Sequence, residues 1–166
     1  MSKMAQAMVF TGGKFNPHEL FEMGTMSKGS LAPLDEHFAT RILPSIAAER
    51  MGAPTGTALN AWENVISGKA RDAKQAKMWM DLGLLDPKKV DLNSHGAPIS
   101  WQAGAVRNTG LAQRDPLAWT EKEMLPALQK HGYDINDPEK LQQALNTLFR
   151  NSNANLFATD LSDPKS

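Results

Sequence analysis

The sequence predicts an all-α fold, an irregular bundle of about seven short helices with one small β-hairpin near residues 89–102. Apolar residues recur at helical spacing in most segments, and prolines and glycines divide the chain into pieces of about 11 residues, the usual helix length. No heptad pattern is sustained, and no repeat of about 20 to 50 residues is visible. We therefore expect one helical domain over residues 1–161, followed by a disordered tail over residues 162–166.

The composition excludes several function classes. The chain has 166 residues, with 18 basic and 18 acidic side chains, so it lacks the basic excess expected of a nucleic-acid-binding domain. It has no cysteine, which excludes disulfides, thiolate metal sites and cysteine nucleophiles. No apolar run approaches the roughly 18 to 20 residues that span a bilayer, and no secretion signal is recognisable at the start. The expected compartment is the cytoplasm in which the chain is made.

The N-terminal part is expected to contain three helical segments. The first lies within residues 1–11, and the second starts at Asn16 and Pro17, a cap followed by a first-turn proline. Asp35 caps the third segment. Because Pro44 lies inside it and lacks an N–H, we predict a kink or two abutting helices there.

Two helices and a hairpin are predicted in the middle of the chain. Residues 52–56 are expected to be a break, residues 57–66 a helix, and Asp72 the cap of a helix that ends at Gly83. Apolar residues then alternate with polar ones on either side of the turn sequence at residues 93–96, which predicts the hairpin.

Helical periodicity returns in the C-terminal part. Asp115-Pro116 and Asp137-Pro138 each combine a cap with a first-turn proline, Pro126 indicates a kink, and Asn153 is the expected cap of the last helix. The residues expected to form the core are Pro116, Leu125, Leu128, Leu141, Leu145, Leu148 and Phe149, with Trp62 and Trp79 in the middle of the chain.

No catalytic, cofactor-binding or metal-ligating residue is predicted. The four histidines do not form the convergent set of three ligands that a metal needs. Neither a nucleophile elbow nor a phosphate-binding loop is present, and the paired carboxylates lie where helix capping explains them. The chain is therefore not expected to be an enzyme or to need a cofactor.

A partner-binding surface is the remaining candidate site. Thioethers pack against many shapes, so exposed methionines can form an adaptable binding face, although core packing is the simpler explanation. Trp101 lies in a glycine-flanked region and is expected near the surface. The candidate partner-binding residues are Met4, Met8, Met23, Met26 and Trp101.

Two stretches carry a resemblance to a known family. Residues 78–90 read MWMDLGLLDPKKV, and residues 115–155 read DPLAWTEKEMLPALQKHGYDINDPEKLQQALNTLFRNSNAN. This succession, with the preceding residues 11–48, resembles a module of the tail tape-measure proteins of bacteriophages and of prophages in Gram-negative bacteria. The resemblance covers roughly residues 5–160 and rests on short motifs.

The resemblance implies a structural role in a phage tail. Tape-measure proteins set tail length and act as the scaffold for the tail tube, so the implied partners are phage tail proteins (tube subunits or tail chaperones), with self-association as an alternative. The implied locations are the host cytoplasm during assembly and the virion tail. Such proteins have many hundreds of residues, whereas 166 residues reach only about 250 Å as one helix, so this chain cannot itself measure a tail.

Two other functions stay open. One is a small prophage-encoded adaptor or regulatory protein that binds its partner through a methionine-rich groove. The other is a peptidoglycan hydrolase, because some tape-measure proteins contain such domains. That alternative predicts a cleft holding a carboxyl group of raised pKa, and no glutamate in a recognisable lysozyme-like context is present.

Overall fold

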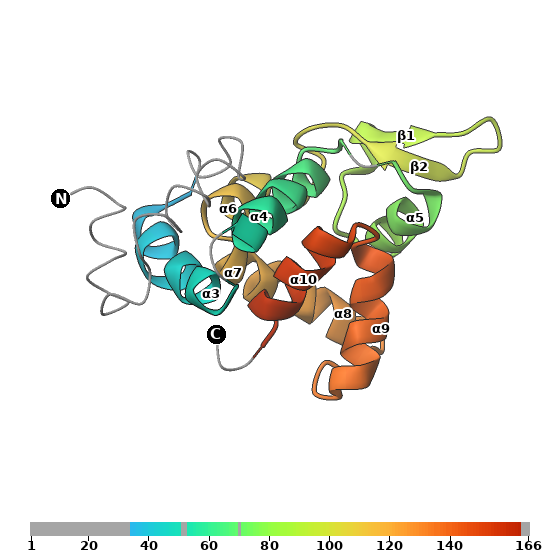
Figure 1. Ribbon diagram of the computed structural model, residues 1–166. Coiled ribbons are helices and arrows are strands. Elements are labelled where there is room, and N and C mark those ends of the chain that lie inside the picture. Colours follow the sequence, from blue (N-terminus) through green and yellow to red (C-terminus); the bar gives the residue numbers. More distant parts are fainter. Residues whose placement is uncertain (1–33, 51–52, 70, 164–166) are drawn as a thin grey trace.

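The computed structural model describes residues 34–50, 53–69 and 71–163 (Figure 1). The predictions for residues 1–33, including both N-terminal helices, and for the last three residues of the tail lie outside these ranges. The helices of the described part are α3 (Leu43–Arg50), α4 (Ala53–Ile66), α5 (Ala73–Asp81), α6 (Thr109–Arg114), α7 (Pro116–Trp119), α8 (Leu125–Lys130), α9 (Pro138–Leu148) and α10 (Ser152–Leu161).

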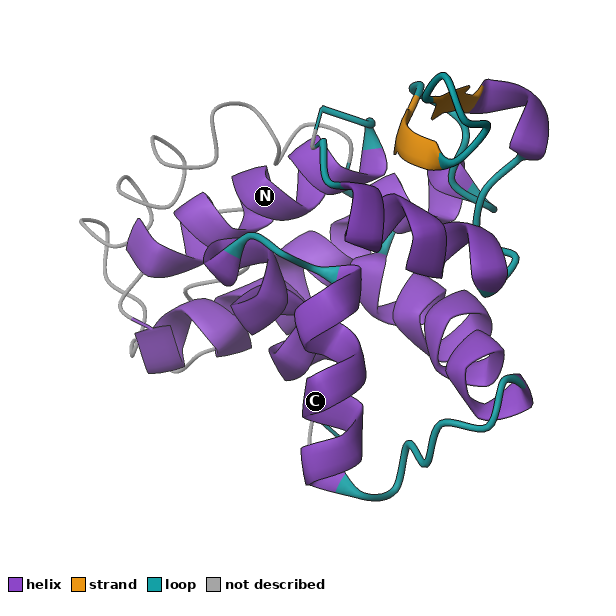
Figure 2. Cartoon of the chain, turned by 90° about the vertical axis from the view of Figure 1, so that its right-hand side faces the viewer, coloured by secondary structure: helices purple, strands orange, loops and turns teal. Residues whose placement is uncertain are grey.

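The predicted all-α class is confirmed. Helices make up most of the described chain, and the antiparallel pair β1 (Val90–Leu92) and β2 (Pro98–Trp101) lies at one end of the bundle (Figure 2). The hairpin is therefore where the alternating pattern predicted it. Helix α10 packs along α4, α9 packs against both α5 and α10, and β2 packs against α5.

The two internal prolines are accommodated by π-helical turns. A π turn over Phe38–Ile42 leads directly into α3 and precedes Pro44, and a second over Thr120–Met124 joins α7 to α8 and precedes Pro126. In each turn the residue before the proline donates its N–H to the carbonyl five residues back. The wider turn avoids the clash and the missing hydrogen bond that proline brings to an α-helix. Where a kink or two abutting helices were predicted at Pro44, and a kink at Pro126, the chain thus forms a π turn within a continuous helix.

The predicted caps at Asp72, Asp115 and Asp137 are confirmed. Each carboxylate accepts a hydrogen bond from a backbone N–H in the first turn of its helix, for example Gln75 N–H to Asp72 at 3.0 Å. The prediction that Asn153 caps the last helix is wrong. Asn151 does so, accepting from the N–H groups of Asn153 and Ala154 at 2.9 and 3.2 Å, because only the residue before the first turn can reach them.

Two helices differ from the prediction. Helix α4 begins at Ala53 and includes Gly56, where a break was expected. Thr55 and Gly56 are buried, so packing offsets the low helix propensity of glycine. Helix α6 was not predicted, because it is short and lacks an apolar stripe. It begins after Asn108, whose φ of 54° is left-handed, and Ala112 anchors it in the core.

One hydrophobic core runs through the described residues, and aromatic rings form its centre. Trp79 contacts Trp101 and Trp119, with ring centroids 5.1 and 5.7 Å apart, and Trp119 contacts Trp62 at 5.6 Å. Trp62 continues the series to Phe157, at 5.7 Å. The predicted core positions Trp62, Trp79, Leu128, Leu145, Leu148, Phe149 and Pro116 are buried, whereas Leu125 and Leu141 are partly buried.

A charge at Leu145 should unfold the chain. Leu145 is 1% exposed, so Leu145→Asp places an unpaired carboxylate in the core and should cost about 4 kcal/mol or more of the free energy of unfolding. Leu156→Asp is the matched control, because Leu156 is 44% exposed on α10. Thermal melts followed by circular dichroism test this, and equal melting temperatures for the two variants would contradict the core assignment.

The cap of α10 can be tested by a pair of alanine variants. Asn151→Ala removes the acceptor for two backbone N–H groups and should lower the free energy of unfolding by about 1 kcal/mol. Asn153→Ala leaves that acceptor in place and should cost less. Urea unfolding measures both free energies of unfolding. A larger decrease for Asn153→Ala than for Asn151→Ala would show that Asn153 caps the helix.

Candidate functional site

The sequence-predicted partner-binding residues do not form a site in the described structure. Met4, Met8, Met23 and Met26 lie outside the described residues. The expectation that Trp101 lies near the surface is wrong, because its side chain is 2% exposed and its indole N–H donates to the Val65 carbonyl at 3.1 Å. Gly68, with a φ of 80°, allows this close packing, since any Cβ at position 68 would collide with the carbonyl oxygen of Trp101.

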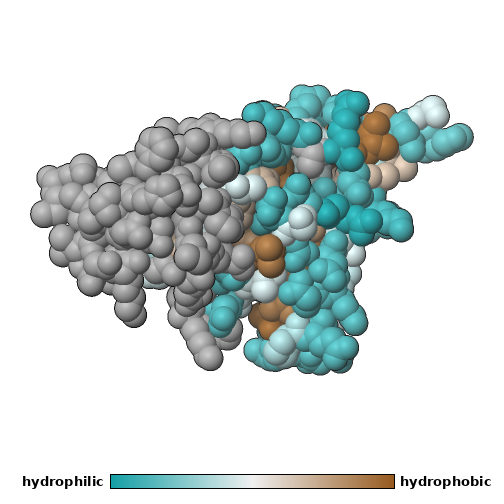
Figure 3. Space-filling model, viewed as in Figure 1, coloured by the Kyte–Doolittle hydropathy of each residue, from teal (hydrophilic) through white to brown (hydrophobic). Residues whose placement is uncertain are grey.

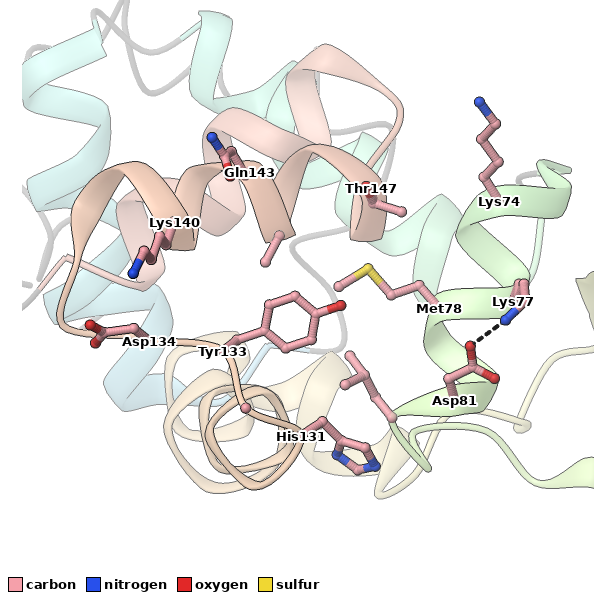
Figure 4. Close-up of a pocket in the computed structure, with 13 residues that line it drawn as sticks. Lys74, Lys77, Met78, Asp81, His131, Tyr133, Asp134, Lys140, Gln143 and Thr147 are labelled. Carbon is pink, nitrogen blue, oxygen red and sulfur yellow. Dashed lines mark hydrogen bonds and ion pairs between the residues drawn. The ribbon is translucent and has the colours of Figure 1, made fainter.

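An open groove of about 830 Å³ lies between α5, α9 and the loop that joins α8 to α9 (Figure 4). Helix α5 and its C-terminal cap contribute Lys74, Lys77, Met78, Asp81 and Leu82 to the lining, α9 contributes Lys140, Gln143, Ala144 and Thr147, and the loop contributes His131, Gly132, Tyr133 and Asp134. We refer to this feature as the α5–α9 groove. It combines an apolar floor with charged rims.

Buried hydrogen bonds set the spacing between the two helical walls. Gln75 Nε2 and Trp79 Nε1, both on α5, donate to the carbonyl oxygen of Leu148 at the end of α9, each at 2.8 Å. A second connection joins the helix ends at the surface, where Arg150 Nε lies 3.3 Å from Asp72 Oδ2. The positions of α5 and α9, and with them the shape of the α5–α9 groove, are therefore determined by contacts in the core.

Tyr133 places an exposed aromatic ring in the lining of the groove. Its ring lies between α9 and α5, with the hydroxyl directed toward Met78 (Figure 4), and it is 39% exposed. It follows Gly132, whose φ of 87° reverses the chain after α8, and its N–H donates to the Leu128 carbonyl at 3.0 Å. The loop backbone thus holds an aromatic ring at the groove surface.

The charged groups around the groove are unevenly paired. Lys77 Nζ lies 2.7 Å from Asp81 Oδ2 on the outer face of α5, and this hydrogen bond raises the pKa of Lys77. Asp134 accepts a hydrogen bond from the Asn136 N–H at 3.0 Å. Neither Lys74 nor Lys140 forms an ion pair with another described residue. Each wall therefore carries a lysine that forms no ion pair within the described part of the chain.

Within the described ranges, His, Asp and Glu side chains do not gather into a group of three that could hold a metal ion. Burial raises the pKa of Glu63, and the amide of Gln113, which donates to it at 3.1 Å, opposes that rise. Glu63 lies on α4 and does not line the groove, so the raised-pKa carboxyl and the α5–α9 groove are separate features.

Figure 3 shows one face of the molecule, coloured by hydropathy. On the face in Figure 3, the described residues are largely hydrophilic, and apolar residues form separate small patches. Scattered apolar residues of this kind are ordinary on protein surfaces. Helices of the described part are too short or too polar to cross a lipid bilayer.

Comparison with known proteins found no family model, no curated protein and no solved structure that matches the chain.

Sequence reasoning missed this site because its two walls are far apart in the chain. Lys74 and Lys140 belong to helices that no local pattern connects. The one available signal was Tyr133, the only tyrosine of the sequence, which stands in a polar loop without a periodic apolar neighbour. An isolated aromatic in such a loop is a candidate contact residue.

The capping carboxylate of α5 should make stability depend on pH. Hydrogen bonds from the Gln75 N–H and from Arg150 lower the pKa of Asp72, so folding favours its charged form. The resulting stabilisation is present above the ordinary carboxyl pKa of about 3.9 and is lost as the pH falls through the lower folded-state value. Asp72→Ala should cost about 1 kcal/mol at neutral pH and progressively less below about pH 4.

Urea unfolding of the natural chain and of Asp72→Ala between pH 7 and pH 2 measures this difference. A gap between the two chains that stayed constant over the whole range would show that the charge of Asp72 does not stabilise α5.

Proposed function

We propose that this chain is an assembly module of a phage or prophage tail tape-measure (minor tail) protein. It acts through contacts with other tail proteins, in the host cytoplasm during assembly and then in the virion tail. Its role is structural, and no catalytic step is assigned to it.

The order of elements in the two resembling stretches carries the proposal. Helix α5 ends in the LGLLDP turn, the hairpin follows, and the helix from Pro116 to Lys130 contains the LPAL motif. Helix α9 then leads into the LFRN sequence, after which α10 begins. These are the elements, in the order, that the resemblance implies.

The shape of the described part supports a docking role over a measuring role. A ruler needs length, and 166 residues in one helix would span about 250 Å. The described helices instead fold back on a single core, and α4 and α10, about 90 residues apart in the chain, pack along each other (Figure 1). Such a module would contribute surfaces on which other proteins dock, and the α5–α9 groove has the form of such a docking surface.

Deletion in a phage or inducible prophage that encodes this chain tests the proposal. An in-frame deletion of residues 34–163 should give particles without tails, or with tails of altered length, in negative-stain electron microscopy. A complementing copy of the natural chain should restore the tails. A Leu145→Asp copy should not, because it lacks the folded core. Normal tails and full infectivity after the deletion would contradict the proposed function.

A further inference from the structure

We infer that the α5–α9 groove binds an acidic amphipathic helix of a partner protein. This inference rests on the proposed function in one respect only, since it names the surface through which the module makes its contacts. It is carried by the dimensions of the groove, by its apolar floor and exposed Tyr133, and by the lysines on its two walls.

The dimensions of the groove suit a helix. At about 1.5 Å per residue, the nine residues of α5 and the eleven of α9 give walls of about 14 and 17 Å. Either wall is therefore as long as two to three turns of a partner helix. Recognition of amphipathic helices in grooves between helices uses apolar anchors spaced three or four residues apart, which two to three turns supply.

The floor and one side of the groove provide the apolar contact. Met78, Leu82 and Ala144 form the floor, and Tyr133 stands beside them with its ring exposed (Figure 4). No hydrogen bond among the described residues involves the Tyr133 hydroxyl. Tyrosine and methionine are both enriched in protein interfaces, because they offer large contact areas to an apolar partner side chain. An aliphatic side chain of the helix would pack between Met78 and Tyr133.

The charges on the rims select an acidic helix. Lys74 and Lys77 stand on the α5 wall and Lys140 on the α9 wall, whereas the aspartates are Asp81, which is paired with Lys77, and Asp134, which lies at the loop end. A helix with an apolar stripe and glutamates on both flanks would place carboxylates beside Lys74 and Lys140. Complementary rim charges mainly accelerate association and determine which partners are accepted.

The same lining disfavours a nucleic acid. A continuous phosphate backbone would pass the carboxylates of Asp81 and Asp134, and the sequence as a whole carries no basic excess. An oligonucleotide is therefore included in the experiment as the competing ligand.

The experiment is an NMR titration of the full chain, labelled with nitrogen-15. Two synthetic peptides of about 15 residues share leucines at helical spacing and differ only in carrying glutamate or lysine on the flanks. A single-stranded oligonucleotide is the third ligand. The glutamate peptide should shift the amide signals of Met78, Tyr133 and Thr147, and the other two ligands should leave them unchanged.

Matched variants show which side chains contribute to binding of the glutamate peptide. Lys74→Glu combined with Lys140→Glu should weaken binding of the glutamate peptide at least about tenfold. Lys88→Glu combined with Lys122→Glu makes the same change of net charge at exposed positions outside the groove and should change binding less than about twofold. Tyr133→Ala should weaken binding about tenfold, and Tyr133→Phe should retain it.

Several results would overturn the inference. These are equal binding of both peptides, amide shifts confined to residues outside the groove, binding of the oligonucleotide in the groove, or equal effects of the two double variants. Absence of binding at millimolar peptide would overturn it as well. Melting temperatures of the variants, measured alongside, identify any that are unfolded. If the Lys74→Glu, Lys140→Glu double variant is unfolded, the Lys74→Gln, Lys140→Gln double variant replaces it.

Failure of this inference and failure of the proposed function give different results. If deletion abolishes tails but the groove variants bind the peptide normally, the module assembles through another surface. If the groove binds the peptide as expected but the deletion leaves tails normal, the groove inference stands and the tail assignment is wrong.

Discussion

Four buried tryptophans hold the described helices in place, each by donating its indole N–H to a backbone carbonyl in another segment. Trp62 donates to Ala112, Trp79 to Leu148, Trp101 to Val65 and Trp119 to Arg107, at 2.8 to 3.1 Å. Burial of each side chain supplies about 4 to 6 kcal/mol, whereas a buried N–H left without an acceptor costs about 1 to 3 kcal/mol. Burial therefore supplies the larger stabilisation, and the hydrogen bonds, which have direction, select one arrangement of the helices.

This arrangement explains which features the sequence could predict. Caps and stop signals are local, so Asp72, Asp115 and Asp137 were recognisable from the residues beside them. Helix α6 was not, because TGLAQR has no apolar stripe of its own. Its place in the fold depends on Ala112, which is buried and whose carbonyl accepts from Trp62, fifty residues away. Tertiary contacts of this kind override local propensity.

The candidate site could not be predicted for a related reason. Sequence reasoning took glycine-flanked Trp101 for a surface residue, but Gly96 and Gly104 mark only left-handed turns of the backbone. The glycine against which Trp101 packs is Gly68, which lies far from it in the sequence. It also looked for exposed apolar residues, whereas the α5–α9 groove combines lysines with a largely buried floor and one tyrosine. Only the fold brings Lys74 and Lys140 into the lining of one groove.

The groove and the core share one acceptor. The Leu148 carbonyl, which receives the indole N–H of Trp79 and the amide of Gln75, joins the C-terminal end of α9 to α5 and so determines how far apart the groove walls stand. Trp79 also stacks on Trp119 and contacts Trp101, so widening the groove would disturb the central aromatic cluster. The walls are thus held in place before any partner arrives. Binding of a partner helix would therefore cost little conformational entropy in the walls, and its affinity would depend on the fit to Tyr133 and on the lysines at the rims.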